Sequence, residues 1–471
     1  MSNSSPATGA RAGASGDIGL LAKEVEGPVF GPEDEGYSGE FAPYNLAMTH
    51  QPAVVVGAAG PGDVGAAIRF AGEHGLPVGV MATGHGASVA AEGGMLVSTR
   101  RMNGIAVDRP ARMARIGAGV RSQQLIDAAA ASGLAPLTGS SPLVAVTGFT
   151  LGGGLSPVLG RTRGWAADHV RAFEIVTADG VTRRLTAAGG DELFWAVRGG
   201  KDNFGIVTAL ELDLFEMPRL YGGGLYFPGA MAADVLDGFR EWTSTAPEEL
   251  TVSVALLRLP PLSSVPEPLR GQFTVHVRVA FLGSAVDGER LVAPIRGLGP
   301  AIIDTVAEMP YAALGSIHAE PRDPLPVYDG SLRLAEFPAA AAGALVQSAG
   351  ADSGSPLTVV EVRHLGGALA RAPEVPSAVT GRDALFQVSC IGLGKPGDAG
   401  ALYASQDNLF RGLRPWQDDQ ATLNYLTARD TSPAALRTAF GAATFGRLAA
   451  IKRAYDPANT FRLNFNIPPA R

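Results

Sequence analysis

Short apolar runs and amphipathic stretches alternate in the first quarter of the chain. Residues 53–56 read Ala-Val-Val-Val and predict a buried strand, and residues 77–80 predict a second one. Between them, apolar positions recur at helical spacing along 63–74, and Gly75 follows, so a helix is expected there. This strand–helix–strand succession predicts an α/β unit over residues 52–107, of the type that binds nucleotides.

Similar patterning continues to about residue 217. The Asp179-Gly180 pair lies between two strand-like runs and predicts a hairpin turn. The pattern predicts strands at 114–117, 172–177, 182–185 and 206–214, and helices at 122–132 and 191–195.

The pattern changes character from about residue 218. Residues 252–257 and 272–282 tend to alternate apolar and polar positions, which predicts an antiparallel sheet with one exposed face. Helices are expected at 285–298 and at 338–348, the second with Pro338 at its first position. Near the end of the chain, one helix is predicted over 436–453, followed by an extended segment at 461–468.

Composition narrows the possible classes of function. A chain of 471 residues predicts about two or three domains. The net charge of −7 has no basic stripe, so a nucleic-acid partner is not expected. No apolar run approaches the roughly 18 residues of a membrane span, and residues 1–17 lack the apolar core of a signal peptide, so a cytoplasmic protein with a polar N-terminal tail is predicted. Cys390 is the single cysteine, and the seven histidines form no HxxxH or HxH pair, so a metal site is not expected.

Three glycine-rich segments carry the strongest chemical signal. They cover residues 82–87, 148–154 and 199–205, and none of them matches a Rossmann or Walker fingerprint. Each one alone reads equally well as an ordinary turn, but together they favour a large anionic ligand, because glycine lets backbone N–H groups approach a phosphate. His85 lies between two glycines, where an imidazole could be a base, a phosphate contact, a nucleophile toward a cofactor or a surface residue.

Longer motifs make the pattern specific. They are TGHGAS at 83–88, GSSPLVAVTGFTLGGGLS at 139–156, DELFWAVRGGKDNFGIVT at 191–208, VEVRHLGGALAR at 360–371 and IKRAYDPANTFRLNFNIPP at 451–469. With these motifs the chain resembles the berberine bridge enzyme-like FAD-linked oxidases of the vanillyl-alcohol oxidase / p-cresol methylhydroxylase (PCMH) superfamily, from about residue 45 to 469.

The resemblance implies an α+β, two-domain PCMH-type FAD-binding fold with a substrate domain of antiparallel sheet covered by helices. The implied parts are a tail and lead-in at 1–44, the FAD-binding domain at 45–217, the substrate-binding domain at 218–420, and a C-terminal segment at 421–471 that completes the FAD domain.

The resemblance also implies the cofactor and its contacts. FAD is expected, with a single covalent bond from His85 to its 8α-methyl group. Ser141 stands where many members carry a cysteine for a second bond. The expected cofactor contacts are Thr83, Gly84, His85, Gly86, Ala87, Ser141, Thr147, Gly148, Gly152, Gly153, Gly205, Ile206, Val207, Asn464 and Asn466. Lys201 takes the place of a glycine often seen in the family and could approach the flavin, a phosphate or solvent.

The catalytic base is less clear from the resemblance. Family members often use the first tyrosine of a Tyr-x-Asn-Tyr/Phe strand, and Thr422 stands at that position. In a strand, Tyr425 at an odd offset would face the other side. Glu361 and His364 lie on the strand expected over the flavin, so either could be the base or a solvent-facing side chain. A carboxylate there would have a raised pKa.

The expected activity is that of an FAD-dependent oxidoreductase. A secondary-metabolite tailoring oxidase is predicted, which passes a hydride from a bulky, largely uncharged substrate to FAD and uses O2 for reoxidation. A flavin-dependent oxygenase or cyclase and a flavin-binding protein without turnover remain alternatives. The sequence does not indicate an oligomeric state.

Overall fold

The computed structural model describes residues 17–86 and 89–471. Its first sheet has the order β1-β2-β4-β3, and the three strands β2, β4 and β3 run parallel. Helix α3 packs its buried apolar positions onto this sheet, as the sequence predicts. The elements are β1 (Val29–Phe30), β2 (Val54–Gly57), α3 (Pro61–Glu73), β3 (Val78–Met81) and β4 (Met95–Ser98).

The second sheet is antiparallel and has the order β5-β6-β10-β8-β9. Its predicted hairpin is confirmed, because Val176 pairs with Thr182 across the Asp179-Gly180 turn. The elements are β5 (Ile105–Asp108), β6 (Met113–Gly117), α4 (Ser122–Ala130), α5 (Val146–Leu151), β8 (Val170–Val176), β9 (Thr182–Thr186), α7 (Glu192–Gly200) and β10 (Ile206–Asp213).

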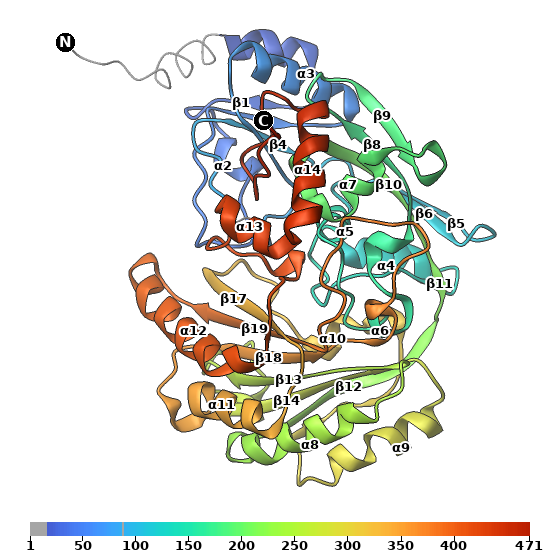
Figure 1. Cartoon of the computed structure of the whole chain (residues 1–471), viewed down its shortest axis with the longest axis vertical. Helices are drawn as coiled ribbons and strands as arrows, with labels where there is room; N and C mark the ends of the chain where they lie inside the picture. Colours follow the sequence, from blue (N-terminus) through green and yellow to red (C-terminus); the bar gives the residue numbers. More distant parts are fainter. Residues whose placement is uncertain (1–16, 87–88) are drawn as a thin grey trace.

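The third sheet has nine strands and forms the lower half of Figure 1. Four helices cover its lower face: α8 (Ala232–Ser244), α9 (Ala285–Arg296), α11 (Ala339–Ala349) and α12 (Ala399–Leu413). The strands are β12 (Arg219–Pro228), β13 (Leu250–Arg258), β14 (Phe273–Phe281), β15 (Ile303–Asp304), β16 (Ala307–Pro310), β17 (Val327–Leu334), β18 (Val359–His364), β19 (Phe386–Leu393) and β20 (Gln417–Asp418).

Apolar and polar positions do alternate along the central strands, but the prediction that one face of this sheet is exposed is wrong. In β13, Val252, Val254 and Leu256 join the core under the helices, while Thr251 and Ser253 point to the opposite face and are buried as well. Polar side chains are tolerated on that face because they hydrogen-bond to one another and to the upper part of the molecule. The second face of this sheet is therefore the roof of an internal site.

The C-terminal helices return to the upper part of the molecule (Figure 1). The single helix predicted over 436–453 is in fact two, α13 (Pro433–Phe440) and α14 (Ala442–Tyr455). Gly441 separates them with a φ of 75°, a conformation that interrupts a helix and favours glycine. Pro338 precedes α11 as its N-cap residue rather than occupying its first helical position.

Short elements complete the fold. They are α2 (Tyr37–Glu40), β7 (Leu134–Ala135), α6 (Gly160–Arg163), β11 (Phe215–Glu216) and α10 (Gly315–His318). The predicted α+β architecture, with a large antiparallel sheet in its own part of the molecule, is confirmed. Within residues 17–86 and 89–471, every helix is too short or too polar to cross a membrane.

Candidate active site and cofactor cavity

A cavity of about 400 Å³ lies where the glycine-rich segments face the polar side of the nine-stranded sheet. One wall is formed by the first and second glycine segments and by the C-terminal tail. The opposite wall, the roof, includes side chains from the nine-stranded sheet and the loops around it. The described lining residues include 80–86, 139–141, 144–145, 147–149, 201–202, 207, 320, 363, 424–425 and 463–465.

His85 stands in the loop after β3 and lines this cavity. Its ring stacks on Tyr44, with centroids 3.9 Å apart and planes 9° from parallel. Nδ1 lies 3.0 Å from Thr83 Oγ1, and Nε2 has no hydrogen-bond partner among the described residues. Burial, helped by the charge of Arg121, lowers the pKa of His85 to about 4. The imidazole is therefore neutral near pH 7, which is the form that can act as a nucleophile.

The loop around His85 needs glycine for two reasons. Gly84 has a φ of 69°, and a Cβ there would lie 2.6 Å from Cα of Pro43. At Gly86 and Gly148, by contrast, a Cβ would meet no atom of the described residues within 4 Å. The space beside these two glycines therefore belongs to the cavity, and a ligand can approach the backbone there.

Several polar atoms of the wall are buried and lack a partner among the described residues. They include Oγ1 of Thr147, Oδ1 of Asn464 and Nε2 of His50. Buried polar groups in proteins are normally hydrogen-bonded, so unsatisfied groups that converge on a cavity indicate a polar ligand. Together with the open glycines, they fit a long cofactor such as FAD, which carries a diphosphate and a polar ring system.

The cavity brings together most of the predicted cofactor contacts. The described residues that line it include Thr83, Gly84, His85, Gly86, Ser141, Thr147, Gly148, Val207 and Asn464. Gly152, Gly153, Gly205, Ile206 and Asn466 lie outside this lining set, and Ala87 lies outside the described residues. At Gly205, a Cβ would lie 2.5 Å from the carbonyl oxygen of Val176, so this glycine permits close packing onto β8.

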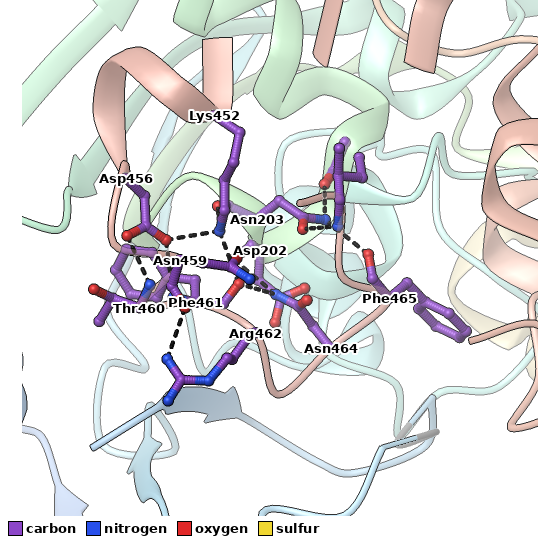
Figure 2. Close-up of polar contacts among 12 residues, drawn as sticks. Asp202, Asn203, Lys452, Asp456, Asn459, Thr460, Phe461, Arg462, Asn464 and Phe465 are labelled. Carbon is purple, nitrogen blue, oxygen red and sulfur yellow. Dashed lines mark hydrogen bonds and ion pairs between the residues drawn. The ribbon is translucent and has the colours of Figure 1, made fainter. Parts of the chain in front are cut away.

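The C-terminal tail is held in the wall by a buried lysine, as Figure 2 shows. Lys452 Nζ donates to Asp456 at 2.7 Å, to the carbonyl oxygen of Asn203 at 2.6 Å and to that of Phe461 at 2.8 Å. Asn203 in turn donates from Nδ2 to the carbonyl oxygen of Phe465 at 3.1 Å. These bonds link the third glycine segment to the tail and so place Asn464 in the cavity wall.

The roof contains an ionic cluster centred on Glu361. Its Oε1 accepts from Ser253 Oγ at 2.6 Å and from Arg278 Nη1 at 2.8 Å, and Arg363 Nη2 lies 3.1 Å from Oε2. Burial alone would raise the pKa of Glu361, but Arg363, Arg278 and His318 outweigh it and hold the pKa well below its usual range. The predicted rise of this pKa is therefore wrong, because Arg363 of the same strand and Arg278 of β14 supply two guanidinium groups.

The positions of Glu361 and Arg363 in the site differ. Arg363 lines the cavity, and its Nε has no partner among the described residues. Glu361 is outside the lining set and stays ionised, so its contacts fix the guanidinium of Arg363 rather than present a base to a substrate.

His364 is also outside the lining set. Its ring stacks on Phe386 with centroids 5.2 Å apart, and its Nε2 lies 3.1 Å from Arg161 Nη1. Burial and the charge of Arg161 lower its pKa to about 3. The prediction of His364 as a base is not supported by this geometry, because the ring is enclosed at the end of β18.

Tyr425 lines the cavity, and the reasoning that would turn it away fails because residues 423–425 form a 3₁₀ turn rather than a strand. Thr422 is buried and donates to Gln387 Oε1 at 2.5 Å. Burial raises the pKa of Tyr425 although Arg363 opposes the rise, so the phenol is protonated near pH 7. In that state it can donate a hydrogen bond but cannot accept a proton.

Glu320 is the cavity carboxylate that the sequence analysis missed. It follows α10 in an irregular loop and shares the cavity with Arg363 and Tyr425. Burial raises its pKa, while a hydrogen bond from Ser140 and the charges of Arg278 and Arg363 oppose the rise. A carboxylate with a raised pKa at a cavity wall is suited to general-base chemistry near neutral pH. No local pattern marks it, since the residue belongs to neither a strand nor a helix.

Comparisons with known proteins agree with this site. The model of the FAD binding domain family matches residues 52–186, and the berberine and berberine-like family model matches residues 424–468. (R)-6-hydroxynicotine oxidase of Paenarthrobacter nicotinovorans is 30% identical over 94% of this chain and 97% of its own length.

Solved structures give the same result for the fold. The crystal structure of 6-hydroxy-D-nicotine oxidase from Arthrobacter nicotinovorans has 27% identity and a TM-score of 0.82, covering 95% of this chain and 98% of that one. The berberine bridge enzyme-like protein 1 of Physcomitrella patens has a TM-score of 0.83 at 20% identity, over 96% and 99% of the two chains. This chain belongs to the berberine bridge enzyme-like family of FAD-linked oxidoreductases.

Proposed function

We propose that this enzyme is an oxidase that transfers a hydride from a bulky organic substrate to FAD bound covalently through His85, and that O2 reoxidises the cofactor. The observation that supports this proposal is that two walls with different functional groups face each other across one cavity. One wall presents His85 and open glycines, and the other presents Glu320, Arg363 and Tyr425. FAD supplies the hydride acceptor, while the chain supplies attachment, orientation and a base.

Attachment through His85 is supported by the state of its ring. The imidazole is neutral, and its ring stacks on Tyr44. Its Nε2 atom has no hydrogen-bond partner among the described residues. Ser141 lines the same cavity, but a hydroxyl is a poor nucleophile without an activating base, so we propose a single bond. Cys390 offers no substitute, because it is buried in the core beneath the nine-stranded sheet and burial raises its pKa.

Glu320 is the proposed proton acceptor. As a hydride leaves a substrate carbon, the proton on the attached oxygen or nitrogen passes to the Glu320 carboxylate, and a C=O or C=N bond forms. Arg363, held by Glu361, faces the same space and stabilises negative charge that develops on the substrate oxygen or nitrogen. Tyr425 orients the substrate through its phenolic O–H group.

The proposed substrate class is a largely uncharged secondary metabolite. This class is supported by the character of the cavity, which combines apolar side chains such as Val144, Leu155 and Phe149 with few charged groups.

The test begins with the purified protein and a panel of alcohols, amines and phenolic natural products. An active compound should bleach the flavin without O2, and air should restore the colour with release of one H2O2 per turnover. Incorporation of labelled oxygen into the product would indicate an oxygenase instead. If only dithionite bleaches the flavin across a broad panel, the oxidase proposal is wrong.

A further inference from the structure

Lys201 has a backbone conformation that ordinary side chains avoid. Its φ of 57° and ψ of −145° place it near a region that is essentially restricted to glycine. The residue directly follows Gly199 and Gly200, so the strain falls on the one position of this turn that carries a long side chain. Strained non-glycine residues of this kind cluster at functional sites, because the strain costs stability without improving packing.

The side chain of Lys201 is directed into the cofactor cavity. Its Nζ lies 4.5 Å from the centroid of the Phe465 ring, and its Cε would be 3.4 Å from a Cβ at Gly152. Both Lys201 and Phe465 line the cavity. A Cβ at Gly152 would also lie 2.6 Å from Asn424 Nδ2, so the glycine leaves room for Asn424 beside the lysine stem.

The ammonium group has an aromatic face beside it but no hydrogen-bond acceptor among the described residues. Burial lowers the pKa of Lys201 to about 8, and the charge of Asp202 opposes that fall. The group is therefore mainly protonated at pH 7. The ammonium group faces the cavity without an acceptor from the described residues, so this wall is suited to a ligand that brings negative charge.

The position of Lys201 favours the ring system of the cofactor over its diphosphate. Asn424, which the structure places against Gly152 and directly before Tyr425 in the chain, lies beside the lysine in the wall. Tyr425 and Glu320 belong to the part of the cavity where the substrate must react. The open glycines that suit a diphosphate, Gly86 and Gly148, come from other segments.

We propose that the Lys201 ammonium is the charge partner of the flavin ring in its reduced, negatively charged state, and so raises the reduction potential of the bound FAD. This inference rests on the proposed function, which places FAD in the cavity with its ring system beside Tyr425 and Glu320. Hydride transfer delivers two electrons and one proton to the ring, and the remaining proton goes to the substrate's base. The ring thus gains one negative charge, which a fixed cation nearby stabilises more than it stabilises the neutral oxidised ring.

The experiment uses holoenzyme with the variants Lys201→Met, Lys201→Gly and Lys201→Arg, and Lys395→Met as a control at an exposed lysine. Midpoint potentials are measured by dye-coupled reduction. Loss of the charge in the Met and Gly variants should make the reduction equilibrium constant about tenfold less favourable, a fall of ~30 mV for a two-electron couple. The Arg variant and the control should stay close to the wild type.

Two further measurements distinguish the effect of the Lys201 charge from that of backbone strain and from that of phosphate binding. Sulfite adds to the flavin ring and leaves a negative charge on it, so its affinity should fall about tenfold in Lys201→Met and Lys201→Gly. In a His85→Ala background, from which FAD can be removed, thermal unfolding should show Lys201→Gly to be more stable than Lys201→Met, because glycine relieves the backbone strain.

The outcomes that overturn the inference are distinct from failure of the proposed function. An unchanged potential and sulfite affinity in flavin-loaded Lys201→Met and Lys201→Gly would refute it. Weaker FAD retention in a His85→Ala background, together with an unchanged potential, would assign Lys201 to the diphosphate instead. If the wild type holds no flavin at all, the proposed function itself fails.

Discussion

Arg363 reaches back along its own strand and donates from Nη2 to both carboxylate oxygens of Glu361, at 3.2 and 3.1 Å. The two residues are two positions apart in β18, so their side chains share the face that forms the roof of the cavity. Arg278 of β14 contacts the same carboxylate from a different strand. The pair therefore sets both the ionisation of Glu361 and the direction of a guanidinium group in the site.

Removing the charge of Glu361 should destabilise the protein. Breaking a buried ion pair by removing one partner costs about 3–5 kcal/mol, and the loss in Glu361→Gln should approach that range because two guanidinium groups lose their shared partner. Denaturant unfolding measures it. The matched control is Glu308→Gln, which breaks a surface pair with Arg219 and should cost about 0–1 kcal/mol. Equal stability of the two variants would contradict a central role for the buried cluster.

The same carboxylate should contribute to acid unfolding. The folded-state pKa of Glu361 is held below the unfolded value of about 4.3, so its stabilisation is present above the unfolded pKa and is lost as pH falls through the folded pKa. As pH falls, the free energy of unfolding should therefore decrease less steeply in Glu361→Gln than in the wild type. An equal decrease in the two proteins would show that Glu361 does not titrate with unfolding.

Glu320→Gln should slow flavin reduction strongly while FAD stays bound. A general base contributes about 10²–10⁴-fold, so a loss of that size is expected in anaerobic stopped-flow measurements with an active substrate. In the wild type the rate should fall as pH decreases through the raised pKa of Glu320, because the protonated acid cannot accept a proton. This acid limb should be absent in the variant. A rate within threefold of the wild type would remove Glu320 from the role of base.

Tyr425→Phe should have a smaller effect. The phenol is protonated near pH 7, so it can form hydrogen bonds but cannot take up the substrate's proton, and flavin reduction should slow less than roughly tenfold, below the usual contribution of a base. Binding of the substrate should weaken alongside it. If Tyr425→Phe alone abolishes reduction, the tyrosine carries the proton and the assignment of Glu320 is wrong.

His85→Ala should abolish covalent attachment. Acid precipitation of the wild type should leave the yellow colour in the pellet, whereas the variant should release it into the supernatant. Peptide mass spectrometry of the wild type should find one flavin peptide, which contains His85, and none that contains Ser141. A flavin that washes out of the wild type in acid would exclude the covalent bond.

Lys452→Met should loosen the C-terminal tail. The lysine and Asp456 are both fully buried, and leaving the carboxylate unpaired should cost about 3–5 kcal/mol, with weaker retention of FAD in a His85→Ala background. Asp456 also accepts from the backbone N–H groups of Thr460 and Phe461, so the double variant Lys452→Met/Asp456→Asn should recover only part of the loss. Full stability of the single variant would show that the tail is held by its apolar contacts alone.

Local patterns predicted the elements whose signal lies within a few residues. The helix at 63–74 and the hairpin at Asp179-Gly180 appear as expected, because periodicity and turn chemistry are local. The single helix over 436–453 and the strand at 422–425 were wrong, because Gly441 adopts a positive φ and residues 423–425 close into a 3₁₀ turn. Both errors concern one or two backbone angles that the apolar pattern does not encode.

The sequence by itself determined the family, the cofactor class and the glycine-rich loop that presents His85, since these depend on contiguous motifs. Only the tertiary structure decided the chemistry of the roof. The pKa of Glu361 is lowered first by Arg363 of its own strand and then by Arg278, 83 positions earlier in the chain, and Glu320 enters the cavity from a loop with no periodic pattern. Charges act through space, and the distances between these groups exist only once the nine-stranded sheet has formed over the glycine loops.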